Sequence, residues 1–346
     1  EISLGLVGSE MCIRDSLWTV CPQVIPIVYR KDGEVMGVIQ DFVDGLQTWI
    51  ENLFKDGIKS QFSSIGDLIK TSFDPNNSDT GVSGLVSNFL TTHPANFTGA
   101  SGSSGTTIWQ TIETLCNNAV VPIAGIIFAI LMINDLIQMV LRGNNFKDFD
   151  DSIFVKWIIK TLCGTILISN VYYIASALFG FGVSATSAAM TTLFNTSVTD
   201  VSLNKNALDG LSIGELISTW LISIIVYLGV IIMIVAIVIV LASRIIEVFM
   251  YLGISPIPVA TLVDGGEFGS VGKNWIKQLI ALSFQGFFII VAIGIFKTLF
   301  NNAISTINSG SGSVTMQMVF LLGYTCALVF TVLRTGAISK SAFNAH

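Results

Sequence analysis

The chain has 346 residues, of which 52% are hydrophobic and only 12% are charged, and its mean hydropathy is +0.74. A soluble domain carries about 25% charged residues, so the composition excludes an ordinary soluble protein. The formal net charge of −6 also argues against a basic surface for nucleic acid. The composition therefore predicts an integral membrane protein.

The sequence lacks the common motifs of catalysis. It contains no GxxxxGK[ST] nucleotide cradle, no HExxH and no GxSxG. Its five cysteines form no CxxC pair, and Cys116, Cys163 and Cys326 lie far apart, as small apolar core residues do. We therefore expect no cofactor, no metal site and no enzymatic activity.

The first 16 residues, EISLGLVGSEMCIRDS, resemble the translation of a sequencing-library adapter. Residues 17–35 have neither a clear period nor the pattern of a signal peptide. Residues 1–35 are therefore interpreted as a non-native leader, and Met36 is the expected natural start.

Residues 36–59 carry apolar side chains at three- and four-residue steps, with acidic and amide side chains on the opposite face. This pattern predicts an amphipathic helix that is too polar to span a membrane. It would lie on a membrane surface, contact a partner, or pack on the protein's own helices. The whole segment 36–118, with a flexible Gly- and Ser-rich linker at 99–107, is expected to be external.

Crossing about 30 Å of hydrocarbon requires about 20 apolar residues. Five stretches meet this requirement: residues 119–141, 157–180, 216–242, 276–296 and 314–333. They predict an all-α transmembrane bundle over residues 119–337, followed by a short tail at 338–346.

A further apolar stretch, residues 245–263, contains Ser255, Pro256 and Pro258. Prolines interrupt a helix because they lack the backbone N–H donor. The stretch is therefore interpreted as a re-entrant or interfacial element and not as a sixth span.

The distribution of Lys and Arg predicts the orientation, because cytoplasmic connections carry an excess of basic residues. Nine would lie on one side: Arg142, Lys147, Lys156, Lys160, Arg244, Lys273, Lys277, Arg334 and Lys340. The other side would carry only Lys205 and Lys297. This bias predicts a multi-pass protein of the cell membrane with its N-terminus outside and its C-terminus in the cytoplasm. The Ser-, Thr- and Asn-rich loop 181–215 would then face outward and meet partners.

Polar residues inside apolar stretches are costly in lipid and are therefore the candidate functional residues. Asp135, Gln138 and Arg142 share one helix face by their spacing, and Lys156 and Lys160 lie where they could reach Asp135. This group would form either a structural ion-pair network or the lining of a hydrated path.

Arg244 and Glu247 are three residues apart at the end of the third span, so they share a helix face. We expect them to pair and to fix how the segment 255–258 folds back against the fourth span, near Gln285. The alternative is that Arg244 only anchors the topology at the membrane interface. Gln285 itself is expected to form an interhelical hydrogen bond.

Four stretches resemble TrbL/VirB-type polytopic subunits of conjugative type IV secretion systems in Gram-positive integrative elements: residues 244–247 (RIIE), 255–261 (SPIPVAT), 272–277 (GKNWIK) and 281–287 (ALSFQGF). Residues 122–125, 136–138 and 156–160 also resemble the first two spans of that family. The likeness runs from about residue 36 to residue 333.

The resemblance implies a channel or scaffold subunit that helps a relaxase–DNA complex cross the membrane, with partner ATPases driving the transfer. It also implies membrane lipid and other secretion subunits as partners, transient contact with the transferred DNA, and an oligomeric place in a larger complex. Two alternatives stay open. One is a secondary transporter, which would usually show inverted repeats, and the other is a non-conducting membrane scaffold.

Overall fold

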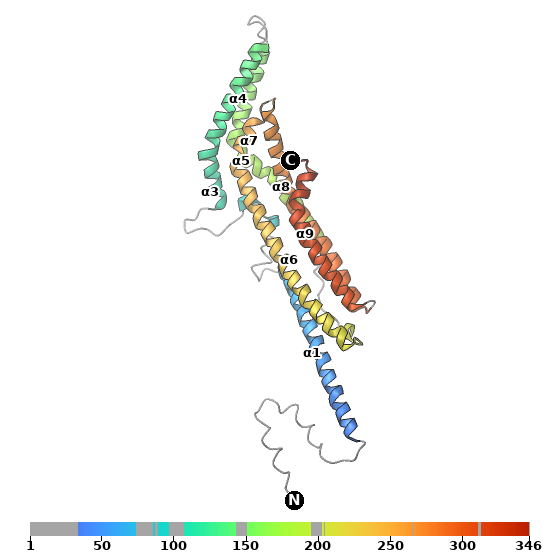
Figure 1. Cartoon of the computed structure of the whole chain (residues 1–346). Helices are drawn as coiled ribbons and strands as arrows, with labels where there is room; N and C mark the ends of the chain where they lie inside the picture. The colour runs from blue at the N-terminus through green and yellow to red at the C-terminus, as the bar shows by residue number, and fades with distance from the viewer. Residues whose placement is uncertain are drawn as a thin grey trace. The chain divides into compact units, whose positions relative to one another are not determined.

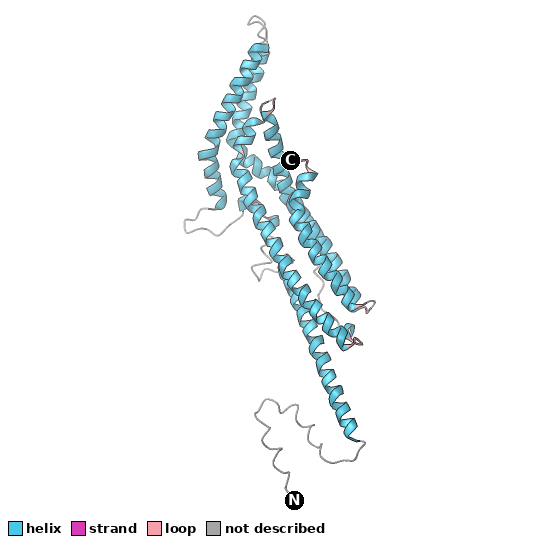
Figure 2. Ribbon diagram, in the orientation of Figure 1, coloured by secondary structure: helices cyan, strands magenta, loops and turns pink. Residues whose placement is uncertain are grey.

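The computed structural model describes residues 34–73, 86, 89–96, 107–142, 151–194, 203, 205–264, 266–310 and 313–345. Most of the expected leader and linker lies outside these residues, as do Lys147 and the side chain of Arg142. Every long regular element within them is a helix (Figure 2). The all-α architecture predicted from the sequence is therefore confirmed.

The elements follow one another along the chain as labelled in Figure 1. They are α1 (Glu34–Phe73), η2 (Pro94–Asn96), α3 (Ile108–Leu115), η3 (Cys116–Val120), α4 (Val121–Arg142), α5 (Asp151–Phe194), η5 (Lys205–Leu208), α6 (Ile213–Ile254), α7 (Pro256–Thr261), α8 (Phe268–Asn308) and α9 (Val314–Ala342).

Five helices of the described chain are long and apolar enough to cross a membrane, which is the number that the sequence predicts. They cover Ile108–Leu141, Phe154–Phe194, Ile213–Ile254, Phe268–Asn308 and Val314–Ala342. However, α5, α6 and α8 contain 44, 42 and 41 residues, so each is about 60 Å long. That length is roughly twice the hydrocarbon thickness of a bilayer. The predicted spans are thus the apolar parts of longer helices.

Helix α5 continues to Phe194, so residues 181–194 do not belong to the loop predicted at 181–215. The small residues of this segment pack against α8 instead, since a Cβ at Gly182 would lie 2.0 Å from the Ser283 hydroxyl oxygen. Thr186 also donates back to the carbonyl of Gly182 at 2.7 Å. A composition that is typical of a loop therefore permits close helix packing here.

Helix α6 runs on to Ile254 and breaks at Ser255, later than the sequence predicts. Pro256 has no N–H, which leaves the Leu252 carbonyl without its usual helical donor. Ser255 supplies the missing donors, because its N–H lies 3.3 Å and its hydroxyl 2.7 Å from that oxygen. The chain then forms the short helix α7, which packs against α4, α5 and α8. The prolines thus interrupt the helix as predicted, while residues 245–254 belong to α6.

The chain divides into two units, Glu1–Asp56 and Gly57–His346. In the first unit, α1 exposes a row of large apolar side chains that are 47–64% accessible: Phe42, Val43, Leu46, Trp49 and Leu53. In the second unit, Ile58, Phe62, Ile65 and Ile69 are at most 4% exposed. The amphipathic helix predicted to end at residue 59 therefore continues to Phe73, and its second part packs on the protein's own helices.

Helix α8 is the central helix of the second unit. It packs along both α5 and α9, and α9 packs along α6 (Figure 1). Its most apolar stretch is 61% buried, more than that of any other candidate span in the described chain. A cluster of buried side chains joins α4, α5, α6, α7 and the start of α8, and it includes Phe128, Leu252 and Trp275.

Candidate functional site

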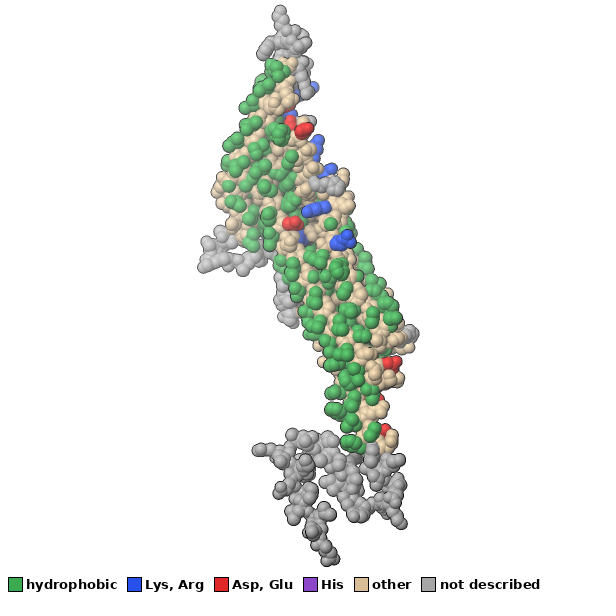
Figure 3. All heavy atoms as spheres, viewed as in Figure 1, with side chains coloured by type: hydrophobic (Ala, Val, Ile, Leu, Met, Phe, Trp, Pro, Cys, Tyr) green, Lys and Arg blue, Asp and Glu red, His purple; other side chains and the backbone are tan. Residues whose placement is uncertain are grey.

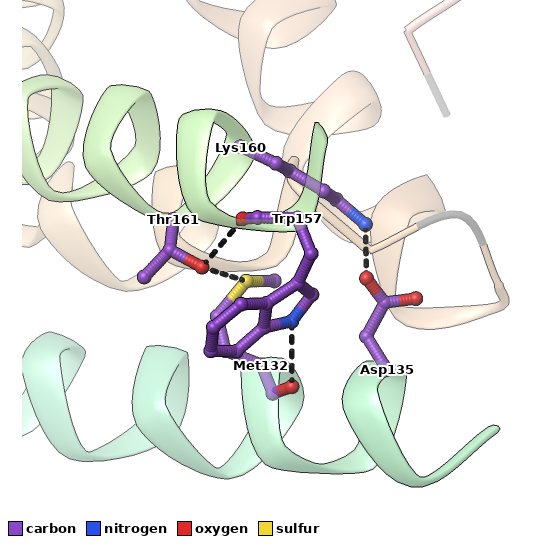
Figure 4. Close-up of polar contacts among 5 residues, drawn as sticks. All are labelled: Met132, Asp135, Trp157, Lys160 and Thr161. Atoms are coloured by element: carbon purple, nitrogen blue, oxygen red, sulfur yellow. Dashed lines mark hydrogen bonds and ion pairs between the residues drawn. The ribbon is translucent and has the colours of Figure 1, made fainter. Parts of the chain in front are cut away.

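An ion pair joins α4 to α5 (Figure 4). The Lys160 ammonium donates to Oδ2 of Asp135 at 2.7 Å, and the two side chains are 34% and 29% exposed. Beside it, the Trp157 indole N–H donates to the Met132 carbonyl at 3.2 Å. The Thr161 hydroxyl lies 3.5 Å from the Met132 sulfur. On each helix these residues are three or four positions apart, so the contacts join one face of α4 to one face of α5.

Two other residues of the predicted network lie outside this contact. Gln138 and Lys156 are both exposed, and neither takes part in the contact between Asp135 and Lys160. Exposed ion pairs in water contribute about 1 kcal/mol or less. We therefore expect the pair to link α4 to α5 with only a modest contribution to the stability of the bundle.

Arg244 is buried where α6 meets α8, with only 2% of its surface exposed. Its Nε and Nη2 donate to the carbonyl oxygens of Leu282 and Ser283 at 3.4 and 3.2 Å. Its Cζ also lies 5.4 Å from the centroid of the Phe179 ring, on α5. Gly286 leaves room for the guanidinium, since a Cβ there would lie 2.8 Å from Nη2. Carbonyl dipoles and an aromatic face thus replace the water that this cation would otherwise need.

The ion pair expected between Arg244 and Glu247 is not formed in the described structure. Arg244 extends to the α8 carbonyls, whereas Glu247 is partly exposed. Spacing along one helix predicts which residues could pair, but it does not reveal that carbonyls of another helix can take the place of the expected partner.

The segment after α6 is held against α8 by close packing, because a Cβ at Gly272 would lie 2.5 Å from the Pro258 carbonyl.

Further polar contacts surround Arg244. The Ser283 hydroxyl donates to the Phe179 carbonyl at 2.7 Å, and the Ser339 hydroxyl of α9 donates to the Ala281 carbonyl. Gln285 is 7% exposed and lines a cavity between α6, α8 and α9. The interhelical hydrogen bond predicted for Gln285 is absent from the contacts of the described residues. Four helices therefore meet at residues 281–286 of α8.

A site around His93 was not predicted from the sequence. Its Nδ1 accepts the Ala95 N–H at 3.2 Å, and its Nε2 lies 3.1 Å from the Ser176 carbonyl. A neutral imidazole protonated on Nε2 satisfies both contacts. A cavity of about 540 Å³ lies beside it, bordered by Asn96 and Ser184. Ser176 is 83 residues away in sequence, so spacing gave no signal for this contact.

The surface separates charge from apolar side chains. On the face shown in Figure 3, Lys and Arg gather along one edge of the part that contains α4 and the C-terminal end of α9, whereas hydrophobic side chains cover most of the surface around α6. Within the described chain, no three His, Cys, Asp or Glu side chains are close enough to hold a metal ion.

The fold and these contacts define an all-α, multi-pass membrane protein whose spans are joined by buried polar groups. Residues 86–256 match the family model described as TrbL/VirB6 plasmid conjugal transfer like protein. Over that region the chain is similar to TrbL/VirB6-type conjugal transfer membrane components. No curated protein and no solved structure matches the chain.

The family match contains α3 to α6, including Asp135, Lys160 and Arg244, and it ends at Pro256. Residues 272–287 of α8, which also carry the resemblance seen in the sequence, lie beyond the match. Arg244 donates to carbonyls of α8, and the Ser255 carbonyl accepts the N–H of Val259 in α7, so both residues connect the matched region to the remaining helices.

Proposed function

We propose that the chain is a channel or scaffold subunit of a conjugative type IV secretion system and helps a relaxase–DNA complex cross the membrane. The observation that carries this proposal is the family match over residues 86–256 in a chain with five apolar helices. Energy for the transfer comes from partner ATPases, because the sequence has no GxxxxGK[ST] cradle of its own. The subunit functions as part of a larger, oligomeric complex.

The proposed orientation places the C-terminus in the cytoplasm and the N-terminal segment outside. The ends of the spans support it, because Lys273 and Lys277 lie near the start of α8, whereas Arg334 and Lys340 lie near the end of α9. In two consecutive spans joined by a short turn, these ends face the same side, where basic residues are retained.

Cysteine labelling tests the orientation. In a chain without its own cysteines, Ser309→Cys should react with an impermeant thiol reagent from outside intact cells, and Ser270→Cys should react only after lysis. These positions flank the two ends of α8. Labelling of Ser270→Cys in intact cells would reverse the proposed orientation.

A crosslinking experiment tests the transfer role. Photo-crosslinking residues at the exposed positions 156 and 334 should capture transferring DNA in donor cells, whereas the lipid-facing position 221 serves as the control. Loss of transfer on deletion together with DNA capture would support a channel subunit. Loss of transfer without DNA capture would support a scaffold. Normal transfer in a clean deletion strain would overturn both.

A further inference from the structure

A cavity of about 430 Å³ lies between α6, α8 and α9, on the side of Arg244 that faces α9. The polarity of its lining residues changes along its length. On α6 the lining passes from Ile239 and Val240 through Ser243 to Glu247. On α9 it passes from Leu333 to Lys340 over the same distance of two helical turns. One end of the cavity is therefore apolar and the other end is charged.

The apolar end reaches the outer surface of the bundle. Ile239 is 59% exposed and Leu333 is 56% exposed, and both lie within candidate membrane spans. The cavity is thus open toward the hydrocarbon region of the bilayer. A ligand that enters there must have an apolar part, because a fully hydrated solute would have to leave water to reach it.

The charged end contains unused hydrogen-bonding capacity. Gln285 is only 7% exposed, its side chain forms no hydrogen bond with another described residue, and it lines the cavity. Arg244 uses two of its five guanidinium N–H donors on the α8 carbonyls. With Lys340 and Glu247, the cavity holds two positive charges and one negative charge, a net charge of +1.

The charged end of the cavity connects the membrane interface with the hydrocarbon region. On α8, Lys277 and Lys297 are 20 residues apart, which is about 30 Å along a helix and matches the hydrocarbon thickness. Gln285 lies eight residues inside that interval from the Lys277 end, and Lys340 lies in the last turn of α9. The charged end of the cavity therefore extends from Lys340, near the basic interface, to Gln285, about 12 Å deeper along α8.

We propose that this cavity binds the phosphodiester headgroup of an anionic membrane phospholipid of the phosphatidylglycerol class. The phosphate accepts hydrogen bonds from Arg244, Lys340 and the Gln285 amide, and a headgroup hydroxyl donates to Glu247. The first part of an acyl chain lies along Ile239 and Leu333. Basic pockets between membrane helices bind anionic headgroups by this chemistry. The proposal is independent of the role in conjugation.

The test is lipid retention by the purified full chain. Protein prepared in a mixture of phosphatidylglycerol and phosphatidylcholine with identical acyl chains is analysed by native mass spectrometry. Wild type should retain phosphatidylglycerol in preference to phosphatidylcholine. Lys340→Gln and Gln285→Leu should each lower that preference by about tenfold. Circular dichroism and gel filtration confirm that each variant is folded.

Arg334→Gln is the matched control. It removes the same charge from the same helix, but Arg334 borders a different surface groove. An equal effect of Arg334→Gln and Lys340→Gln would show diffuse attraction and overturn the proposal, as would equal retention of the two lipids. Displacement of the lipid by excess inorganic phosphate would identify a site for free phosphate and overturn the lipid assignment.

Discussion

Arg244 and Ser283 join three helices at one point. The guanidinium of Arg244 on α6 donates to the Ser283 carbonyl at 3.2 Å, and the Ser283 hydroxyl donates to the carbonyl of Phe179 on α5 at 2.7 Å. The Phe179 ring in turn lies beneath the guanidinium, with 5.4 Å between the ring centroid and Cζ. A single turn of α8 therefore positions both α5 and α6.

Replacing Arg244 by Lys tests whether this contact depends on the shape of the cation or only on its charge. Lys keeps the positive charge but loses the planar fork that reaches two carbonyls and stacks on Phe179. We expect Arg244→Lys to lower the free energy of unfolding in mixed micelles by about 1–3 kcal/mol. The measurement is the denaturant midpoint of the purified chain.

Two controls accompany that variant. Arg334→Lys makes the same chemical change at an exposed position and should leave the midpoint within experimental error. Glu247→Gln should also be nearly neutral for stability, because Arg244 is bonded to α8 and not to Glu247. A loss of stability in Glu247→Gln as large as that in Arg244→Lys would show that Arg244 and Glu247 form the ion pair that the sequence predicts.

The sequence predicted the parts of the fold that depend on composition and local pattern. Five apolar stretches predicted the five candidate spans, and Pro256 predicted the end of α6. The contact between Lys160 and Asp135 also agrees with spacing on two neighbouring spans. Each of these features is encoded within about 20 residues or in adjacent helices.

The remaining features depend on residues that are distant in sequence. The partners of Arg244 are backbone carbonyls 38 and 39 residues away, which no side-chain pattern marks. Gly182 and its neighbours have the composition of a loop, but α8 supplies a surface that only small residues can approach. The second half of α1 is buried for the same reason, because Gly57 lies against Trp220 of α6 and Gln61 accepts a hydrogen bond from the Ser223 hydroxyl of the same helix.

The ion pair between Asp135 and Lys160 should show measurable but modest coupling. We expect a double-mutant cycle with Asp135→Asn and Lys160→Gln to give a coupling energy of about 0.5–1 kcal/mol, because both side chains are partly exposed. The measurement is again the unfolding midpoint of the four proteins. A second cycle that combines Asp135→Asn with Lys156→Gln is the control, since Lys156 is exposed and outside the contact. Equal coupling for both lysines would contradict a specific pair.

Gly182 should be intolerant of any side chain. A Cβ there would lie 2.0 Å from the Ser283 hydroxyl and 2.6 Å from the Ser283 carbonyl group, so α5 would have to move away from α8. We expect Gly182→Ala to lower stability by about 1–3 kcal/mol. Ser283→Ala should not rescue it, because the clash includes backbone atoms that every residue has.

Gly125 provides the comparison, because a Cβ at that position would meet nothing within 4 Å. Gly125→Ala should be neutral or slightly stabilising, since Ala favours a helix over Gly by about 1 kcal/mol. A shift of the same sign and size in both variants would show that helix propensity, and not the contact between α5 and α8, sets the outcome at Gly182.

The two parts of α1 should respond in opposite ways to the loss of an aromatic side chain. Trp49 is 63% exposed, whereas Phe62 is fully buried. Phe62→Ser should therefore lower stability by about 3–5 kcal/mol, because it leaves a cavity and an unpaired hydroxyl. Trp49→Ser should change the stability of the purified chain by less than about 0.5 kcal/mol. If the exposed face of α1 contacts a partner subunit, one of the alternatives left open by the sequence, Trp49→Ser should nevertheless reduce transfer at a normal protein level. Gln40→Ser, an exposed polar change on the same helix, should not. Wild-type transfer with Trp49→Ser would show that the exposed apolar row of α1 has no partner in conjugation.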